Sequence, residues 1–134
     1  MTKKVEEITA AYTKVHEKLF PGEAMTELFF EDDHFGTPYL EVTRAGYQYT
    51  VKERGNIQTA ETFQDLDDFF YRFFGHLTFQ VSCDFEAQNR VDPSADSRIL
   101  IFAHQKELMG RHSEEWRRKT EAEISKITEE YPFY

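Results

Sequence analysis

Cysteine is nearly absent from this chain. Cys83 is the only one in 134 residues, so neither an internal disulfide nor a cysteine-based zinc site can form. Long apolar runs are also missing, and none approaches the roughly 20 residues that span a bilayer. No apolar stretch follows the lysines near the start, as it would in a signal peptide. We therefore expect a cytoplasmic protein with no membrane partner.

Positive charge is in short supply too. The chain has 16 lysines and arginines against 25 acidic residues, which gives a formal net charge of -9. Phosphate groups repel such a chain at long range, so we do not expect it to bind nucleic acid. A protein partner with a basic surface would suit this charge. The alternative is that the acidity only keeps the protein soluble.

Signatures of catalysis are missing as well. The sequence contains no glycine-rich phosphate loop, no Gly-x-Ser-x-Gly and no His-Glu-x-x-His. The five histidines are scattered over different predicted elements. We therefore expect no catalytic residues, no metal site and no cofactor, and we do not expect an enzyme.

Aromatic residues, by contrast, are abundant. They make up 16% of the chain, with 13 Phe and 7 Tyr, so each core position can bury a large apolar area. A chain of this length can build such a core without disulfides or metal, and we expect a single domain over residues 1–134.

Periodicity predicts an α+β fold. Apolar residues at spacings of three and four predict a helix over residues 2–20, which ends at Pro21-Gly22. Alternating residues and short polar turns then predict an antiparallel meander of three or four strands. The expected strands are 28–31, 39–43, 47–52 and 57–61. Three C-terminal helices follow, the first over residues 66–90 with a capping box at Thr62, and we expect them to pack on one face of the sheet.

The predicted turn over residues 31–35, with the tyrosines near it, combines acidic and aromatic residues. Buried aromatic anchors inside a charged rim are typical of protein interfaces. We therefore take this region as a candidate partner-binding site. It comprises Glu31, Asp32, Asp33, Phe35, Tyr39, Tyr47 and Tyr49. The alternative is a solvated hairpin whose aromatic side chains turn into the core.

Polar residues also fall on the apolar faces of the predicted C-terminal helices. Asp84 continues the apolar face of the first of them, and a buried carboxylate needs a cation. The candidate cations are Arg98 and Arg90, and we expect an Asp84–Arg98 pair that fixes the register of two helices, with Gln88 or Gln105 completing its hydrogen bonds. The alternative role for Asp84 is a catalytic acid in a cleft. Glu86 and Arg90 are spaced to form a separate, solvated ion pair.

The second half of the chain resembles the immunity protein 63 family of bacterial polymorphic toxin systems. The resemblance depends on a spaced pattern, not on one short motif. Its residues are Leu66 to Tyr71, Phe74, Thr78-Phe79, Asp84 to Glu86, Arg90, Asp96 to Arg98, Phe102, Gln105, Leu108, Trp116 and Tyr131 to Phe133. The chain departs from the pattern at Ser97, where the family prefers the first of two arginines.

This resemblance implies a cytosolic antitoxin with an α+β fold that neutralises a cognate toxin by binding it. Positions shared across such a family hold the fold, so the resemblance implies structural roles for Asp84, Glu86, Arg90, Arg98, Gln105 and Trp116. Two other functions stay open from the residues alone. One is a non-catalytic small-molecule-binding or regulatory domain, and the other is a hydrolase that uses Asp84 with a histidine.

Overall fold

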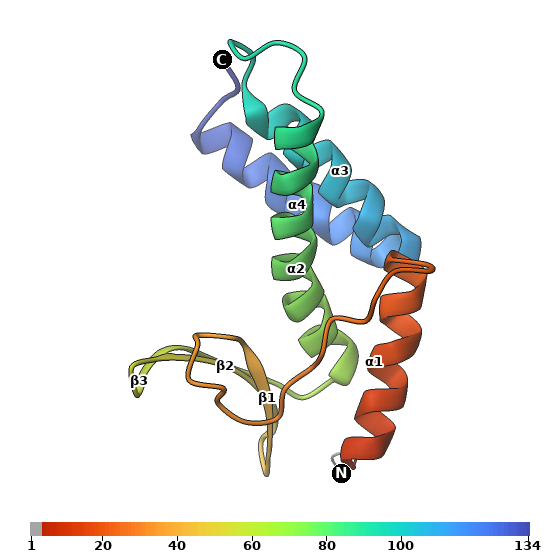
Figure 1. The fold of residues 1–134 in the computed structure, drawn as a ribbon, viewed down its shortest axis with the longest axis vertical. Coiled ribbons are helices and arrows are strands. Elements are labelled where there is room, and N and C mark those ends of the chain that lie inside the picture. The colour runs from red at the N-terminus through yellow and green to blue at the C-terminus, as the bar shows by residue number, and fades with distance from the viewer. Residues whose placement is uncertain (1–3) are drawn as a thin grey trace. The chain divides into compact units, whose positions relative to one another are not determined.

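The computed structural model describes residues 4–134 and has an α+β fold (Figure 1). An N-terminal helix comes first, then a three-stranded antiparallel sheet and three further helices, which confirms the predicted class and element order. The elements are α1 (Val5–Leu19), β1 (Tyr39–Thr43), β2 (Gly46–Glu53), β3 (Asn56–Phe63), α2 (Leu66–Gln88), α3 (Ser97–His112) and α4 (Glu114–Glu130).

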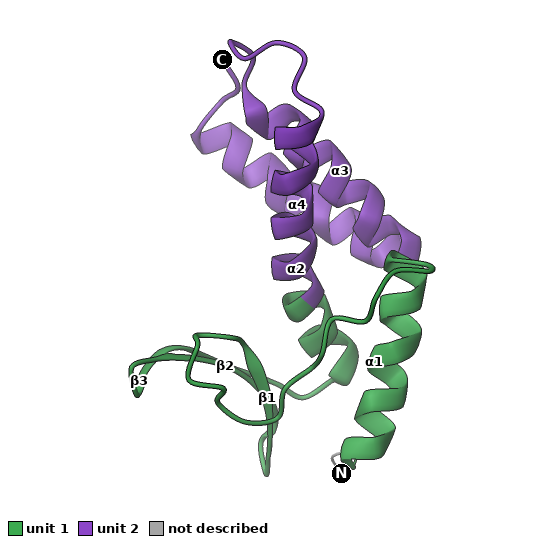
Figure 2. Ribbon diagram, viewed as in Figure 1, with its two compact units in different colours: residues 1–73 green, residues 74–134 purple. Residues whose placement is uncertain are grey.

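The chain divides into two compact units (Figure 2). Unit 1 ends at Phe73 and contains α1, the sheet and the start of α2. Unit 2 begins at Phe74 and contains the rest of α2 with α3 and α4. Helix α2 therefore contributes to both units. That residues 1–134 fold as a single domain stays a prediction.

The sheet of unit 1 is a meander with the strand order β1-β2-β3. A two-residue loop, Arg54-Gly55, joins β2 to β3, and both residues have positive φ, at 52° and 80°. This is the geometry of a type I′ turn, whose twist matches that of the flanking strands. Gly46 at the start of β2 has φ 136°, and a Cβ there would lie 2.3 Å from the Phe63 carbonyl oxygen. Only glycine fits that position.

Aromatic packing builds the core of unit 1. Helix α1 buries the predicted stripe at Ile8, Tyr12, Val15 and Leu19. The Tyr12 ring meets Phe73 edge-on at 5.5 Å and Phe70 at 6.1 Å, both from the start of α2. The Tyr12 hydroxyl donates a hydrogen bond to the carbonyl of Thr26, so the buried polar group is satisfied.

Two local predictions for unit 1 were wrong. Residues 28–31 do not form a strand, because the only pairing there is a single bridge between Phe29 and Tyr39. Thr62 does not cap α2, because β3 continues to Phe63. Asp65 takes that role, and its Oδ1 accepts a hydrogen bond from the Asp67 amide at 2.9 Å.

Unit 2 is a three-helix assembly in which α3 and α4 lie side by side (Figure 1). Ser113 ends α3 and caps α4 by accepting a hydrogen bond from the Trp116 amide. This tight connection makes α3 and α4 an antiparallel hairpin. Trp116 is fully buried and packs against Phe74 of α2, with ring centroids 6.2 Å apart.

Candidate partner-binding site

The acidic turn before β1 is held by its own carboxylates. The Asp32 Oδ1 accepts a hydrogen bond from the His34 amide at 2.9 Å. The Asp33 Oδ1 accepts one from the Phe35 amide at 2.9 Å and a longer one from the Thr37 amide at 3.4 Å. Hydrogen bonds from the Thr37 side chain and the Phe35 amide lower the pKa of Asp33. Asp33 therefore stays ionised and orders the turn.

This order holds an aromatic side chain in solvent. Phe35 is 89% exposed. Its neighbour His34 has φ 67°, in the left-handed region, and its imidazole lies 3.5 Å from the Asp32 carboxylate. A turn of this kind fixes the backbone of Phe35, so less backbone entropy is lost when a partner covers the ring.

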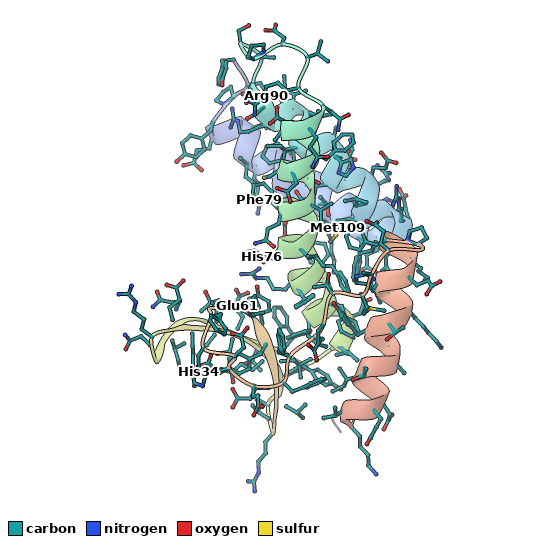
Figure 3. All side chains as sticks on the ribbon, viewed as in Figure 1. His34, Glu61, His76, Phe79, Arg90 and Met109 are labelled. Atoms are coloured by element: carbon teal, nitrogen blue, oxygen red, sulfur yellow. The ribbon has the colours of Figure 1, made fainter. Side chains whose placement is uncertain are left out.

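The turn lies beside the tip of the β2–β3 hairpin. An open hollow of about 570 Å³ is lined by His34, Phe35 and Gly36 from the turn and by Glu53, Arg54, Asn56 and Gln58 from the hairpin. A Cβ on Gly36 would lie 3.4 Å from the Glu53 side chain, so the two segments are in close contact. Figure 3 labels His34 at this surface. Ile57 of β3, which does not line the hollow, is also exposed, at 60%.

The three tyrosines of the predicted site do not lie at the surface. Tyr39, Tyr47 and Tyr49 are all buried in unit 1. Tyr49 packs on Phe69, with ring centroids 6.0 Å apart. The Arg72 guanidinium lies over the Tyr49 ring, with its carbon 4.3 Å from the ring centroid. Burial raises the pKa of Tyr49, so its hydroxyl stays protonated. These tyrosines belong to the core of unit 1, while Glu31, Asp32, Asp33 and Phe35 are the members that reach the surface.

The expected Asp84–Arg98 pair does not form. Asp84 is exposed on α2. Arg98 instead pairs with Asp96, whose carboxylate lies 2.8 Å from Nη2 and caps α3 through the Arg98 amide. Asp96 is closer in sequence and sits where the helix dipole favours a carboxylate, so it takes the cation. The Arg98 side chain holds the pKa of Asp96 at about 2.

Arg98 also anchors the C-terminal tail, which the sequence did not reveal. Its Nη1 donates a hydrogen bond to the Tyr131 carbonyl at 2.8 Å, and its Nη2 donates one to the Pro132 carbonyl at 2.9 Å. The guanidinium lies over the Phe133 ring at 5.3 Å. Arg98 therefore joins the start of α3 to the segment after α4.

The remaining polar residues of the predicted network lie in unit 2. Glu86 and Arg90 form the expected i,i+4 ion pair, with two nitrogen–oxygen distances of 2.9 and 2.6 Å. The pair is less solvated than expected because Glu86 is buried. Gln105 donates a hydrogen bond to the Gly75 carbonyl at 2.9 Å, which links α3 to α2. Figure 3 labels Arg90 near the end of α2.

One side-chain pair in unit 2 has the composition of a nucleophile and its base. The Ser82 hydroxyl lies 3.1 Å from the His104 Nδ1. Ser82 is fully buried, and Phe85 stacks on the imidazole with ring centroids 3.9 Å apart. Burial also lowers the pKa of His104. A substrate has no access to this hydroxyl, so the pair serves to join α2 to α3.

Residues 4–134 offer neither a metal-binding cluster nor a membrane-spanning helix. Within this part of the chain, no three His, Cys, Asp or Glu side chains gather so that they could hold a metal ion. No helix there is long and apolar enough to cross a membrane.

The model of a family described as Immunity protein 63 matches residues 44–126. No curated protein and no solved structure matched the chain. The match runs from the turn before β2 into α4, so the acidic turn, β1 and the C-terminal tail lie outside it.

Proposed function

The chain belongs to the immunity protein 63 family, and from this premise we propose that it is a cytoplasmic antitoxin of a polymorphic toxin system. In this proposal it binds one cognate toxin domain stoichiometrically and covers the toxin's active site, with no turnover of its own. The family match over residues 44–126 is the observation that carries the proposal.

We further propose that the toxin contacts the surface formed by the acidic turn and the β2–β3 hairpin tip. Phe35 and Ile57 offer exposed apolar anchors, and Glu31, Asp32 and Asp33 supply the charged rim. An acidic rim speeds encounter with a basic partner, and aromatic anchors supply most of the affinity. Because the turn lies outside the family match, it can differ among relatives that face different toxins.

The form of the hollow favours a protein over a small ligand. Small-molecule sites are enclosed and mostly apolar, with a few convergent polar groups. The hollow at the turn is open, and most of its lining side chains are polar or charged. An open, largely polar surface of this kind suits a protein interface, whose composition is close to that of ordinary surface.

The test uses the C-terminal domain of a large secreted protein encoded beside this chain. Co-expression with this chain should restore growth that the domain alone arrests, and the two should purify together. Failure of both with a folded chain would contradict the antitoxin proposal.

Four variants locate the surface. Asp32 and Asp33 bond the turn, so their reversal would disturb it. Glu31 is exposed and makes no such bond among the described residues, so Glu31→Lys reverses charge without that effect. Glu31→Lys should slow association most at low salt.

Phe35→Ala should raise the dissociation constant at least tenfold, which is about 1.4 kcal/mol. Tyr134→Ala, at an equally exposed aromatic of unit 2, and Val91→Ala should leave affinity unchanged. If neither Glu31→Lys nor Phe35→Ala changes toxin binding, the toxin contacts another surface.

A further inference from the structure

The outer side of the α3–α4 hairpin carries an apolar groove within unit 2. The groove holds about 250 Å³, and its apolar walls are Ile99 and Phe102 of α3, Ile124 of α4 and Phe133 of the tail. Ile99 is 49% exposed and Phe133 is 42% exposed. Exposed apolar side chains that gather in this way mark interaction surfaces.

The tail wall of the groove is fixed in place. Arg98 donates to the two carbonyls before Phe133, and the Asp96 Oδ2 accepts a hydrogen bond from the Tyr134 amide at 3.3 Å. The Phe133 ring also lies 6.2 Å from Phe102. The ring is therefore held in order while much of it remains in water. Such preorganisation lowers the entropic cost of covering it.

The groove also carries opposite charges on its two walls. Lys106 lies on the α3 wall and makes no ion pair within residues 4–134. Glu121 lies on the α4 wall, 2.9 Å from the Arg117 guanidinium. A surface that pairs with a copy of itself must be self-complementary, so each charge needs its opposite at the symmetry-related position.

We propose that this groove is the interface of a symmetric homodimer of this chain. A two-fold axis along the groove lays α3 of one copy over α4 of the other, at the same height. Lys106 then faces Glu121 of the second copy, and the apolar walls meet beside these pairs, towards the end of the groove where the tail lies. Each helix has antiparallel neighbours, which is the arrangement of a four-helix bundle. The dimer is independent of the proposed toxin binding.

The size of the face sets the strength of association. Helix α3 has 16 residues and is about 24 Å long, and two adjacent helices present a face about 20 Å wide. Each copy therefore covers about 500 Å², so the two together bury roughly 1,000 Å², at the low end for specific interfaces. Net charge of -9 on each copy adds repulsion. The dimer is weak and depends on concentration.

Sedimentation analysis of the full chain tests the dimer. From micromolar to millimolar concentration at physiological salt, the mass should rise from one chain towards two. Ile99→Glu places a charge in the interface and should weaken association at least tenfold. Val5→Glu is the matched control, because Val5 is also 49% exposed but lies on α1. Circular dichroism checks that each variant stays folded.

A charge exchange tests the predicted pairing. Lys106→Glu and Glu121→Lys should each weaken the dimer, and the double variant should recover most of the loss. Lys126→Glu makes the same charge change on α4 outside the groove and should weaken association less than Lys106→Glu. No recovery in the double variant would overturn the arrangement.

Outcomes of two further kinds overturn the proposal. One is a chain that stays monomeric at millimolar concentration, or a dimer that is unaffected by Ile99→Glu. The other is a monomer whose toxin complex is lost on Ile99→Glu, because the groove would then belong to the toxin.

Discussion

Replacing Phe69 by alanine should cost most of the stability of unit 1, while the same change at Phe35 should cost almost none. Phe69 is fully buried, and four aromatic rings surround it at centroid distances of 6.0 to 6.4 Å. Truncating such a phenylalanine removes about 3–5 kcal/mol, from lost transfer free energy and the cavity left behind. That is a large part of the roughly 5–15 kcal/mol that holds a domain folded.

Urea denaturation followed by far-ultraviolet circular dichroism measures this cost. With a denaturant dependence of about 2 kcal/mol per molar urea, a loss of about 4 kcal/mol lowers the midpoint by roughly 2 M. Phe35→Ala should change the free energy of unfolding by less than about 0.5 kcal/mol, because the ring is in water already. A Phe69→Ala loss below about 1 kcal/mol would refute the placement of this ring at the centre of the aromatic core.

Three further predictions concern stability. Gly46→Ala should destabilise the protein by more than about 1 kcal/mol in the same urea assay, because its φ is positive and the new Cβ meets the Phe63 carbonyl. Gly75→Ala is the control within helix α2, where an added Cβ meets no neighbouring atom, and it should be neutral or stabilising. The pKa of Asp96 falls from 3.8 to about 2 in the folded chain, so its carboxylate stabilises the fold above pH 4 and this contribution is lost as the pH falls towards 2. The difference in unfolding free energy between the wild type and Asp96→Asn should therefore shrink over that pH range. Because helix α2 belongs to both units, they should unfold together. Trp116 fluorescence reports unit 2 and tyrosine absorbance is weighted to unit 1, so both signals should give the same urea midpoint. Two separate midpoints would contradict a single domain.

The order and type of elements could be predicted because local signals agree. The apolar stripe of α1, the alternation in β1 and β2 and the Ser113 cap each arise from residues close in sequence. Boundaries were less predictable where two local signals compete. Thr62 has the spacing of a helix cap, but pairing with β2 extends β3 past it, and Asp65 is left to cap α2.

Contacts between distant residues could not be predicted from spacing. Helical periodicity placed Asp84 on a buried face but could not show that this position of α2 is exposed, while Ser82 and Glu86 beside it are buried. It also could not show that Arg98 would reach two carbonyls more than thirty residues away. Phe35 and the turn at Arg54 likewise line the same hollow only once the sheet has folded. The sequence indicated the acidic turn as a candidate site, and the hairpin half of that surface is a tertiary feature.

The account depends on obstruction of a toxin by one bound copy of this chain. The most direct test is a titration of the purified toxin domain, well above the dissociation constant, with increasing amounts of this chain while toxin activity is measured. Activity should fall in a straight line and reach zero at one equivalent, and Phe35→Ala should round the line off. Complete loss at a small fraction of an equivalent would indicate turnover, and full activity in the presence of excess chain would show that it does not neutralise this toxin.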